Sequence, residues 1–361
     1  MSLRVIQWAT GNVGRAAIQG ISSHPELELV GTWVHSEAKE GRDAGELCGL
    51  APLGVQATRD IDTLLAMDAD CILYSPVLAE PEIVVRMLEA GKNVVTPLGW
   101  FYPFHSQGVS PGVAEIEAAC RRGGASLHGT GIHPGGITER FPLTVSALCS
   151  EITHVRAEEF SDIRTYLAEF VVREVMLFGK TPEQAEKSPM LAMLGQNFNQ
   201  SIDMVADAMG FDLDADKRAT HEMAVATERI EAPVGPIEPG TVAAQRFTWE
   251  GLVRGEPVMT VRVNWLMGEE HLEPAWSFGP ERERFEVEIA GDPGVHLTFR
   301  GLHPSSLEEG IERNKGIVVT AMHCVNAIPA VCRAEPGIRT YLDLPLTSGT
   351  AHPRLRADRA D

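Results

Sequence analysis

The feature that most constrains this chain is a glycine turn close to its start. An apolar run over residues 5–9 breaks at Thr10-Gly11-Asn12-Val13-Gly14 and resumes over residues 15–18. This order is typical of a strand, a tight turn and a helix. Gly11 lets the backbone approach a pyrophosphate, Gly14 lets the helix pack closely on the strand, and the N–H groups of the first helical turn point at the anion. The turn predicts phosphate binding, although similar turns also occur without a ligand.

The segments that follow alternate between strands and helices up to residue 131. Further strands are expected over residues 27–34, 70–76, 92–97 and 125–129, and helices over 60–65, 80–90 and 115–122. Continuous apolar strands suit a parallel sheet that is covered on both faces. We therefore predict the α/β class, with a Rossmann doubly wound parallel sheet, and interpret the turn as the G-x-G-x-x-G dinucleotide motif with Ala9 in its first position.

The pattern changes after residue 131. Helical stretches are expected between residues 167 and 227, and alternating strand patterns occupy residues 246–267 and 281–302, which indicates a second, α+β domain with an open mixed or antiparallel sheet. We predict four parts: a Rossmann domain at 1–135, a substrate and dimerisation domain at 136–314, a helix and segment that return to the Rossmann domain at 315–345, and a tail at 346–361.

Composition excludes several classes of partner. The 361 residues include 50 acidic and 31 basic side chains, and a formal net charge of −19 repels nucleic acid and anionic membranes. A core strand begins close to Met1, and no apolar run approaches the roughly 20 residues of a membrane span, so we expect a cytoplasmic protein. The six cysteines have no C-x-x-C spacing, which favours reduced core residues and no metal site.

The carboxyl ends of parallel strands mark the expected cofactor site. After the second strand stand His35 and Ser36, where an NAD-preferring protein usually has Asp or Glu, and then Lys39 and Arg42. Cationic side chains there can hold a 2′-phosphate, so we predict a preference for NADP(H), with NAD(H) still possible. The alternative is that Lys39 and Arg42 are solvated loop charges. The expected cofactor residues are Ala9, Thr10, Gly11, Asn12, Val13, Gly14, His35, Ser36, Lys39, Arg42, Ser75, Pro76, Thr96, Gly131 and Asn326.

Candidate catalytic and substrate residues lie in two loops of the same edge and at the start of the second domain. His133, Tyr102 and His105 can donate or accept a proton, and His133 is alternatively a structural histidine in a tight loop. Aromatic residues suit an apolar substrate or interdomain packing. The cluster at the start of the second domain suits recognition of a polar group or forms a solvated surface, and it consists of Glu158, Glu159, Asp162, Arg164 and Tyr166. The substrate candidates are Trp100, Phe101, Asp162 and Tyr166.

Five blocks along the chain carry a family resemblance: VIQWATGNVGR, GTWVHSEAKEGRDAGELCG, NVVTPLGW, GTGIHPGG and TAMHCVNAIPAVCRAEPGIRTYLDLP. The chain resembles the dihydrodipicolinate reductase-like NAD(P)-dependent oxidoreductases, in the actinobacterial branch related to native amine dehydrogenases and 2,4-diaminopentanoate dehydrogenase. The resemblance implies a homodimer built by the second domain, and conversion of a ketone and ammonia to an amine with NAD(P)H.

Two positions depart from the pattern of the amine dehydrogenases. Their loop matching Gly129 to Gly135 reads Asn where this chain has His133. Their glutamate, which acts on ammonia or the imine, lies in the loop after the strand equivalent to residues 93–96, and here no Asp or Glu occurs between Pro97 and Gly112. His105, Tyr102 or His133 would have to replace that base.

The sequence thus predicts an NAD(P)H-dependent oxidoreductase that transfers hydride to or from a small, largely apolar carbonyl, imine or amine at the domain interface. One alternative is an amine dehydrogenase that uses ammonia. The other is a protein that senses NADP(H) without turnover, which needs the cofactor turn but no proton donor.

Overall fold

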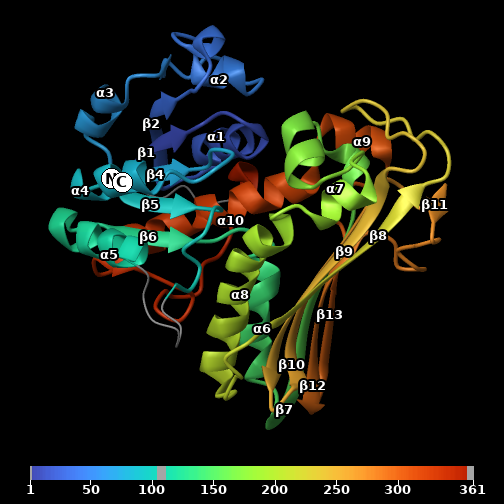
Figure 1. Ribbon diagram of the computed structural model, residues 1–361. Coiled ribbons are helices and arrows are strands. Elements are labelled where there is room, and N and C mark those ends of the chain that lie inside the picture. The colour runs from blue at the N-terminus through green and yellow to red at the C-terminus, as the bar shows by residue number, and fades with distance from the viewer. Residues whose placement is uncertain (1, 104–110, 356–361) are drawn as a thin grey trace. The chain divides into compact units, whose positions relative to one another are not determined.

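The computed structural model describes residues 2–103 and 111–355 and divides the chain into two compact units (Figure 1). Unit 1 combines Met1–Gly131 with Ile317–Asp361, and unit 2 is Ile132–Gly316. The N-terminal and C-terminal parts of the sequence therefore fold together in unit 1.

The core of unit 1 is a sheet of seven parallel strands in the order β14-β6-β5-β4-β1-β2-β3. Apolar side chains fill its strands, and all four residues of β4 are buried. The chain order reverses between β1 and β4, which is where a doubly wound sheet binds its ligand. The expected Rossmann sheet is confirmed. Its strands are β1 (Leu3–Trp8), β2 (Leu27–Trp33), β3 (Ala57–Thr58), β4 (Cys71–Tyr74), β5 (Asn93–Thr96), β6 (Ser126–Gly129) and β14 (Gly337–Ile338).

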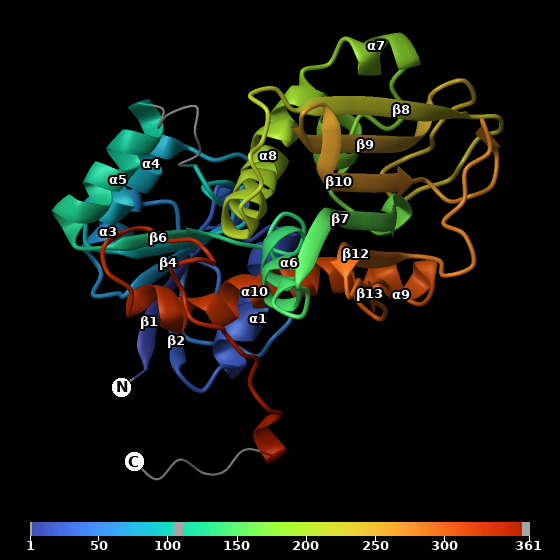
Figure 2. The ribbon, with the colours of Figure 1, turned by 90° about the horizontal axis from the view of Figure 1, so that it is seen from below.

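Helices cover both faces of this sheet (Figure 2). Side chains of α1 and α10 pack with Val5 and Leu73 on one face, and α3, α4 and α5 pack with Ile6 and Ile72 on the other. Because successive strand residues face opposite ways, one strand serves both cores. The elements are α1 (Asn12–Ser23), η1 (Glu37–Lys39), α2 (Ala44–Leu47), α3 (Ile61–Ala66), α4 (Pro81–Glu89), α5 (Pro111–Gly123), α10 (Lys315–Cys332) and η5 (Pro353–Leu355).

Helix α10 is the most apolar of the long helices. Within the described part of the chain it alone is long and apolar enough to cross a membrane, with a mean hydropathy of 1.4. Its residues Ala321, Cys324, Val325 and Ile328 are buried in the same hydrophobic core as Val5. This packing is that of a core helix on the Rossmann sheet.

Unit 2 contains a second sheet of seven strands, in the order β11-β8-β9-β10-β7-β12-β13. Strands β10 and β7 are parallel and the other neighbours are antiparallel, so the sheet is mixed. The expected α+β domain with an open sheet is confirmed. The strands are β7 (Glu151–Asp162), β8 (Arg218–Ala226), β9 (Val242–Val253), β10 (Glu256–Leu266), β11 (Leu272–Glu273), β12 (Arg284–Asp292) and β13 (Val295–Phe299).

Helices α6 and α8 lie against one face of this sheet (Figure 1). Phe198 and Ile202 of α8 pack on Phe247 and Trp249 of β9. The helical segments are η2 (Gly136–Arg140, a π-helix), α6 (Phe141–Ser146), η3 (Ile163–Thr165), η4 (Val171–Val175, a π-helix), α7 (Pro182–Glu186), α8 (Met190–Met209) and α9 (Leu307–Glu312).

One sequence-based expectation for unit 2 is wrong. Residues 218–226 were expected within a helical region and instead form β8, which pairs antiparallel with β9 along most of its length. Pairing with a long neighbouring strand overrides the local helix preference of this segment.

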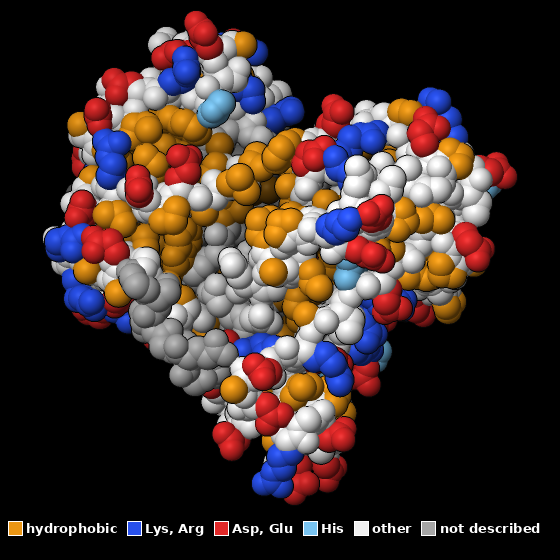
Figure 3. All heavy atoms as spheres, viewed as in Figure 1, with side chains coloured by type: hydrophobic (Ala, Val, Ile, Leu, Met, Phe, Trp, Pro, Cys, Tyr) orange, Lys and Arg blue, Asp and Glu red, His pale blue; other side chains and the backbone are white. Residues whose placement is uncertain are grey.

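The face of the molecule seen in Figure 3 carries acidic and basic side chains that are interspersed among polar ones. Exposed ion pairs such as Arg86–Asp62 and Lys187–Glu183 join neighbouring charges on the two units. On this face the acidic residues are therefore spread among basic ones and not gathered in one patch.

Candidate functional site

The glycine turn of unit 1 forms an open cradle at the N-terminus of α1. Gly11 is the N-cap residue, and no side chain caps the first turn of the helix. The first N–H groups of a helix have no partner within the helix, so these donors are available to an anion. A Cβ built on Gly11 would meet no atom within 4 Å, which leaves room for a ligand beside the backbone.

Gly14 and Ala9 hold the helix close to β1. A Cβ built on Gly14 would overlap the carbonyl group of Ala9, so only glycine allows this approach. Ala9, at the first glycine position of the motif, has a φ of 73°. A non-glycine residue in this left-handed region costs on the order of 1 kcal/mol, which the surrounding structure must offset.

Gln7, on the strand that precedes the turn, holds the turn in place. The glycine motif did not indicate this role. Its side-chain Nε2 lies 3.0 Å from the Ala9 carbonyl oxygen and 2.9 Å from Ser75 Oγ. Gln7 is fully buried on β1, and Ser75 follows β4. The buried amide therefore links the cradle to the neighbouring strand at the point where the sheet order reverses.

Lys39 reaches the cradle from the segment after β2. Its Nζ donates to the backbone oxygen and to Oγ1 of Thr10, both at 3.1 Å. His35 and Ser36 are exposed on the same segment, and Arg42 is exposed beyond η1. An ammonium group beside free helix N–H groups fits a phosphate-bearing dinucleotide. The residues present thus fit a nicotinamide dinucleotide.

The ends of β5 and β6 are joined to the late part of the chain. Thr96 Oγ1 accepts from the Leu98 N–H at 3.1 Å. The Gly131 carbonyl accepts from His323 Nδ1 at 2.5 Å, and Thr130 Oγ1 contacts both His323 and the Tyr341 hydroxyl. His323 and Tyr341 therefore fix the loop at the carboxyl end of β6. Neither was singled out from sequence, although both stand in the late block that carries the resemblance.

The aromatic loop after β5 is tightly packed where it is described. A Cβ on Gly129 would overlap the Gly99 carbonyl, so the loop passes directly over the end of β6. Phe101 is 1% exposed, whereas Trp100 and Tyr102 are half-buried. The substrate role of Trp100 and Phe101 and the proton-transfer role of Tyr102 stay predictions. His105 lies outside the described residues.

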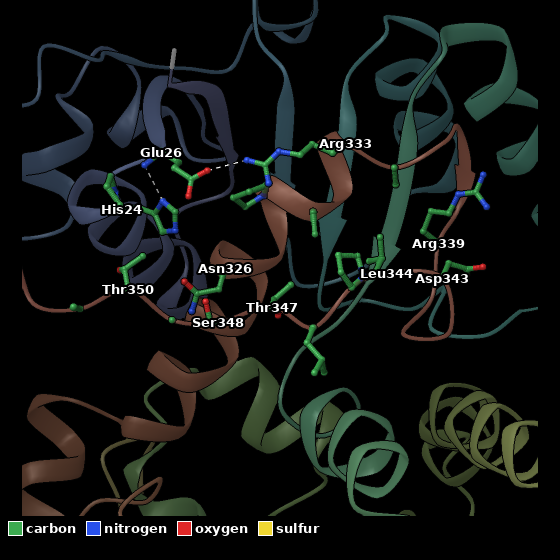
Figure 4. Close-up of a pocket in the computed structure, with 18 of the residues that line it drawn as sticks. His24, Glu26, Asn326, Arg333, Arg339, Asp343, Leu344, Thr347, Ser348 and Thr350 are labelled. Atoms are coloured by element: carbon green, nitrogen blue, oxygen red, sulfur yellow. Dashed lines mark hydrogen bonds and ion pairs between the residues drawn. The ribbon is translucent and has the colours of Figure 1, made fainter. Parts of the chain in front are cut away.

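Asn326, expected to contact the cofactor, lines a different cavity of unit 1. This cavity of about 1340 Å³ is bounded by the loop before β2, the second half of α10 and the C-terminal segment. Figure 4 shows Asn326 beside Ser348, with His24 and Glu26 on another wall. His24 and Glu26 precede β2, so this cavity lies at the amino end of that strand, whereas the cradle lies at the carboxyl ends.

His133 lies at the start of unit 2 among aromatic rings. Its ring centroid is 5.1 Å from that of Phe198 and 6.0 Å from that of Phe285. Burial lowers the pKa of His133 to about 3. The imidazole is therefore neutral at pH 7, and its expected role as proton donor stays a prediction for this neutral form.

Strand alternation separates the charged residues that were grouped from sequence. Glu158 lies with Arg156, Arg262 and Asn264. Glu159, its neighbour on β7, faces the opposite side, because successive residues of a strand alternate. The two carboxylates thus belong to different environments.

The substrate candidates Asp162 and Tyr166 also differ. Asp162 accepts hydrogen bonds from the backbone N–H and Nε of Arg164, both at 3.0 Å, and so caps η3. Burial, with the charges of Glu159 and Glu283, raises the pKa of Tyr166. Tyr166 is therefore a neutral phenol near Glu159, whereas Asp162 is occupied by a local ion pair. Their roles toward a substrate stay predictions.

Glu159 is the centre of a polar cluster on the helix-covered face. Ser161 Oγ donates to Glu159 Oε1 at 2.6 Å, and Trp265 Nε1 donates to the same oxygen at 3.1 Å. Ser161 also contacts His303 Nε2 at 2.9 Å. Burial raises the pKa of Glu159 to about 7 and lowers that of His303 to about 4. Sequence reasoning missed Ser161, Trp265 and His303, which lie far apart along the chain.

Comparison with known proteins places this architecture in a family. Residues 137–354 match the 2,4-diaminopentanoate dehydrogenase C-terminal domain, and residues 5–96 match the N-terminus of dihydrodipicolinate reductase. The chain belongs to the 2,4-diaminopentanoate dehydrogenase family. The resemblance found in the sequence blocks is thereby confirmed, as is the expectation of an NAD(P)-dependent oxidoreductase.

Two curated relatives and one solved structure show how far the similarity extends. An amine dehydrogenase of Streptomyces virginiae is 32% identical over 95% of this chain and 96% of its own length. The 2,4-diaminopentanoate dehydrogenase of Acetoanaerobium sticklandii is 26% identical over 64% of this chain and 61% of its own. The amine dehydrogenase structure from Mycobacterium smegmatis has a TM-score of 0.78 at 21% identity, covering 97% of this chain and 98% of that one, which supports the fold.

Proposed function

We propose that this protein is an amine dehydrogenase that interconverts a small, largely apolar ketone and ammonia with the corresponding amine. The open cradle at Gly11, with Gly14 packed against Ala9 and Lys39 at Thr10, is the observation that carries the nicotinamide part of the proposal. Similarity to an amine dehydrogenase along nearly the whole chain supports the choice of amine chemistry.

NADP(H) is the preferred cofactor in this proposal. Lys39 holds an ammonium group at the cradle, and the segment between β2 and η1 has no carboxylate at positions 35 and 36 to bind a ribose 2′-hydroxyl. Arg42 can add charge from the exposed end of the same segment. Asn326, which lines the cavity beside the C-terminal segment, is left out of the proposed cofactor set.

The bound nicotinamide supplies or accepts a hydride at the substrate carbon. The chain's own task is then to bind the cofactor, hold the substrate and move protons. The N–H groups of the cradle would hold the pyrophosphate, and Lys39 would hold the 2′-phosphate. The neutral His133 can offer a hydrogen bond to the substrate without bringing a positive charge. The buried rings of Phe285 and Phe198 lie beside His133 and would exclude water from it.

A homodimer in the cytoplasm completes the proposal. The sheet face of unit 2 opposite α6 and α8 carries an ion-pair network around Arg156, Glu158, Glu286 and Glu288. Such a paired surface suits contact with a second copy of the same sheet. Light scattering on the purified protein checks this part: a monomer at micromolar concentration would contradict it.

Turnover of a ketone panel with NADPH, with and without ammonium, tests the proposed function. We expect oxidation of NADPH only when ammonium is present, and faster turnover with NADPH than with NADH. Turnover without ammonium would instead support carbonyl reduction. Tight NADPH binding with no turnover under either condition would favour a sensor.

A further inference from the structure

We propose that Glu159 is the acid–base group of the amine reaction, and that Ser161 and His303 position it. This inference rests on the proposed function. It offers a group for the role that the family's loop glutamate plays, in a chain that has no carboxylate between Pro97 and Gly112.

The hydrogen bonds leave one oxygen of Glu159 available. Oε1 accepts from both Ser161 and Trp265, whereas Oε2 makes no hydrogen bond within residues 2–103 and 111–355. A carboxylate oxygen that makes no hydrogen bond can accept one from a ligand. Oε2 is therefore the atom assigned to the substrate nitrogen.

The direction of the remaining hydrogen bonds shows how Glu159 is held. Ser161 has one hydroxyl proton and donates it to Glu159, so it must accept from His303 Nε2–H. His303 then carries its lone pair on Nδ1, a buried atom without a hydrogen-bond partner among the described residues. His303 thus holds the Ser161 hydroxyl in the orientation that points its proton at Glu159.

Several titratable groups lie around Glu159. Tyr166 after η3, Glu283 before β12 and His303 after β13 all lie around Glu159, and the ring of Phe285 is 4.6 Å from that of His303. Burial raises the pKa values of both Glu159 and Glu283 to about 7. An acid–base group works best when its pKa lies near the working pH, and Glu159 meets that condition.

The proposed steps balance as follows. Glu159 Oε2 takes a proton from ammonium, and the freed ammonia forms a C–N bond as the carbonyl π pair moves to oxygen. The same carboxyl group carries protons from nitrogen to that oxygen until the C–O bond breaks and water leaves. These steps convert a ketone and ammonium to an iminium ion and water, with no net proton gained or lost by Glu159.

Hydride addition to the iminium carbon then gives a neutral amine. The Glu159 carboxylate must first take up one proton from solvent, and the amine nitrogen then takes that proton, which leaves Glu159 again as the carboxylate. The overall reaction consumes one ketone, one ammonium ion, one reduced cofactor and one proton. It produces the protonated amine, the oxidised cofactor and water.

Glu139 provides a matched control in the same unit. It is also buried, and burial also raises its pKa to about 7. Its two oxygens, however, accept from the hydroxyls of Ser201 and Thr138, so neither is left for a substrate. If burial alone made a carboxyl group catalytic, replacing Glu139 and replacing Glu159 would change kcat equally.

Glu159→Gln and Glu139→Gln variants test the assignment in steady-state assays with ammonium. We expect Glu159→Gln to lower kcat by about 10²- to 10⁴-fold, with NADPH affinity and melting temperature little changed, and Glu139→Gln to keep wild-type kcat. Infrared spectra recorded between pH 6 and 8 should lose one titrating carboxyl band in Glu159→Gln. Equal kcat in Glu159→Gln and wild type would overturn the inference.

Ser161→Ala gives a second readout that does not remove the carboxyl group. The Ser161 hydrogen bond lowers the pKa of Glu159, so its loss should move the acidic limb of the pH–rate profile to higher pH and reduce kcat. An unshifted profile would overturn the positioning role of Ser161. A wild-type protein with no ammonium-dependent turnover would instead defeat the proposed function, and this inference with it.

Discussion

The cofactor cradle of unit 1 and the Glu159 cluster of unit 2 are built in opposite ways. The cradle uses the backbone of consecutive residues, from Ala9 to Gly14, and glycine is required where two backbones approach. The cluster uses side chains from β7, β10 and the segment after β13, joined through hydroxyl and indole groups. A local backbone site can be identified from a short motif, whereas a site of distant side chains depends on the sheet that assembles it.

The largest effect is expected where backbone packing defines the cradle. Gly14→Ala places a Cβ against the Ala9 carbonyl, whereas Gly11→Ala places one in open space. We expect Gly14→Ala to lower the free energy of unfolding of unit 1 by about 3 kcal/mol, and Gly11→Ala to keep stability and weaken NADPH binding. Thermal melts and fluorescence titration measure these effects. Equal melting temperatures for the two variants would show that the cradle tolerates bulk at both positions.

Replacement of Glu139 should have a smaller effect on the free energy of unfolding, and this effect should depend on pH. Its folded-state pKa is raised to about 7 by burial, so its contribution to stability is fully present at low pH and is lost as pH rises through 7. Glu139→Gln cannot ionise and should reduce the loss of stability between pH 5 and 8 by up to about 3 kcal/mol. Glu159 and Glu283 still titrate, so a weaker slope will remain. Urea unfolding at several pH values measures it, and an unchanged slope contradicts the prediction.

Loss of the charge that is proposed to select NADPH should cost about 1–3 kcal/mol of NADPH binding free energy. Lys39→Ala should weaken NADPH binding by about 10- to 100-fold and change NADH binding much less, because the lost ammonium group is assigned to the 2′-phosphate. Arg42→Ala, on the same segment, should have a smaller effect. Calorimetric titration with both cofactors separates them, and equal losses for NADPH and NADH in Lys39→Ala would refute the assignment.

The smallest effect is expected at Asp162, where the structure shows a cap and an ion pair with Arg164. Loss of a cap costs about 1 kcal/mol, so Asp162→Ala should lower the melting temperature by a few degrees. The KM of the ketone should stay near its wild-type value. A large rise in KM would favour the substrate role predicted from sequence.

Sequence patterns were sufficient for features that repeat along the chain or stay within a few residues. The alternation of apolar strands and helices predicted the Rossmann sheet, and the turn from Ala9 to Gly14 has the geometry of a phosphate cradle. The strand β8 was missed because pairing with β9, which lies later in the chain, decides its conformation.

Side chains brought together by the fold were less accessible to sequence reasoning. Period-two alternation could have shown that Glu158 and Glu159 face opposite sides of β7, since this follows from the strand itself. His303 gave no such signal, because its contact with Ser161 requires β12 and β13 to pair beside β7. Asn326 shares its helix with core residues, and only the helix path shows which end of the sheet it approaches.

The return of residues 317–361 to unit 1 has a consequence for biosynthesis. The N-terminal segment with the cradle leaves the ribosome long before α10 and β14 are made. The face of the Rossmann sheet that includes Val5 and Leu73 is therefore covered by α1 but lacks α10 during most of translation. Unit 2 has its own core and can fold in the meantime. Completion of the nucleotide-binding unit is thus a late event, and premature termination would leave its apolar sheet face open to aggregation or to chaperones.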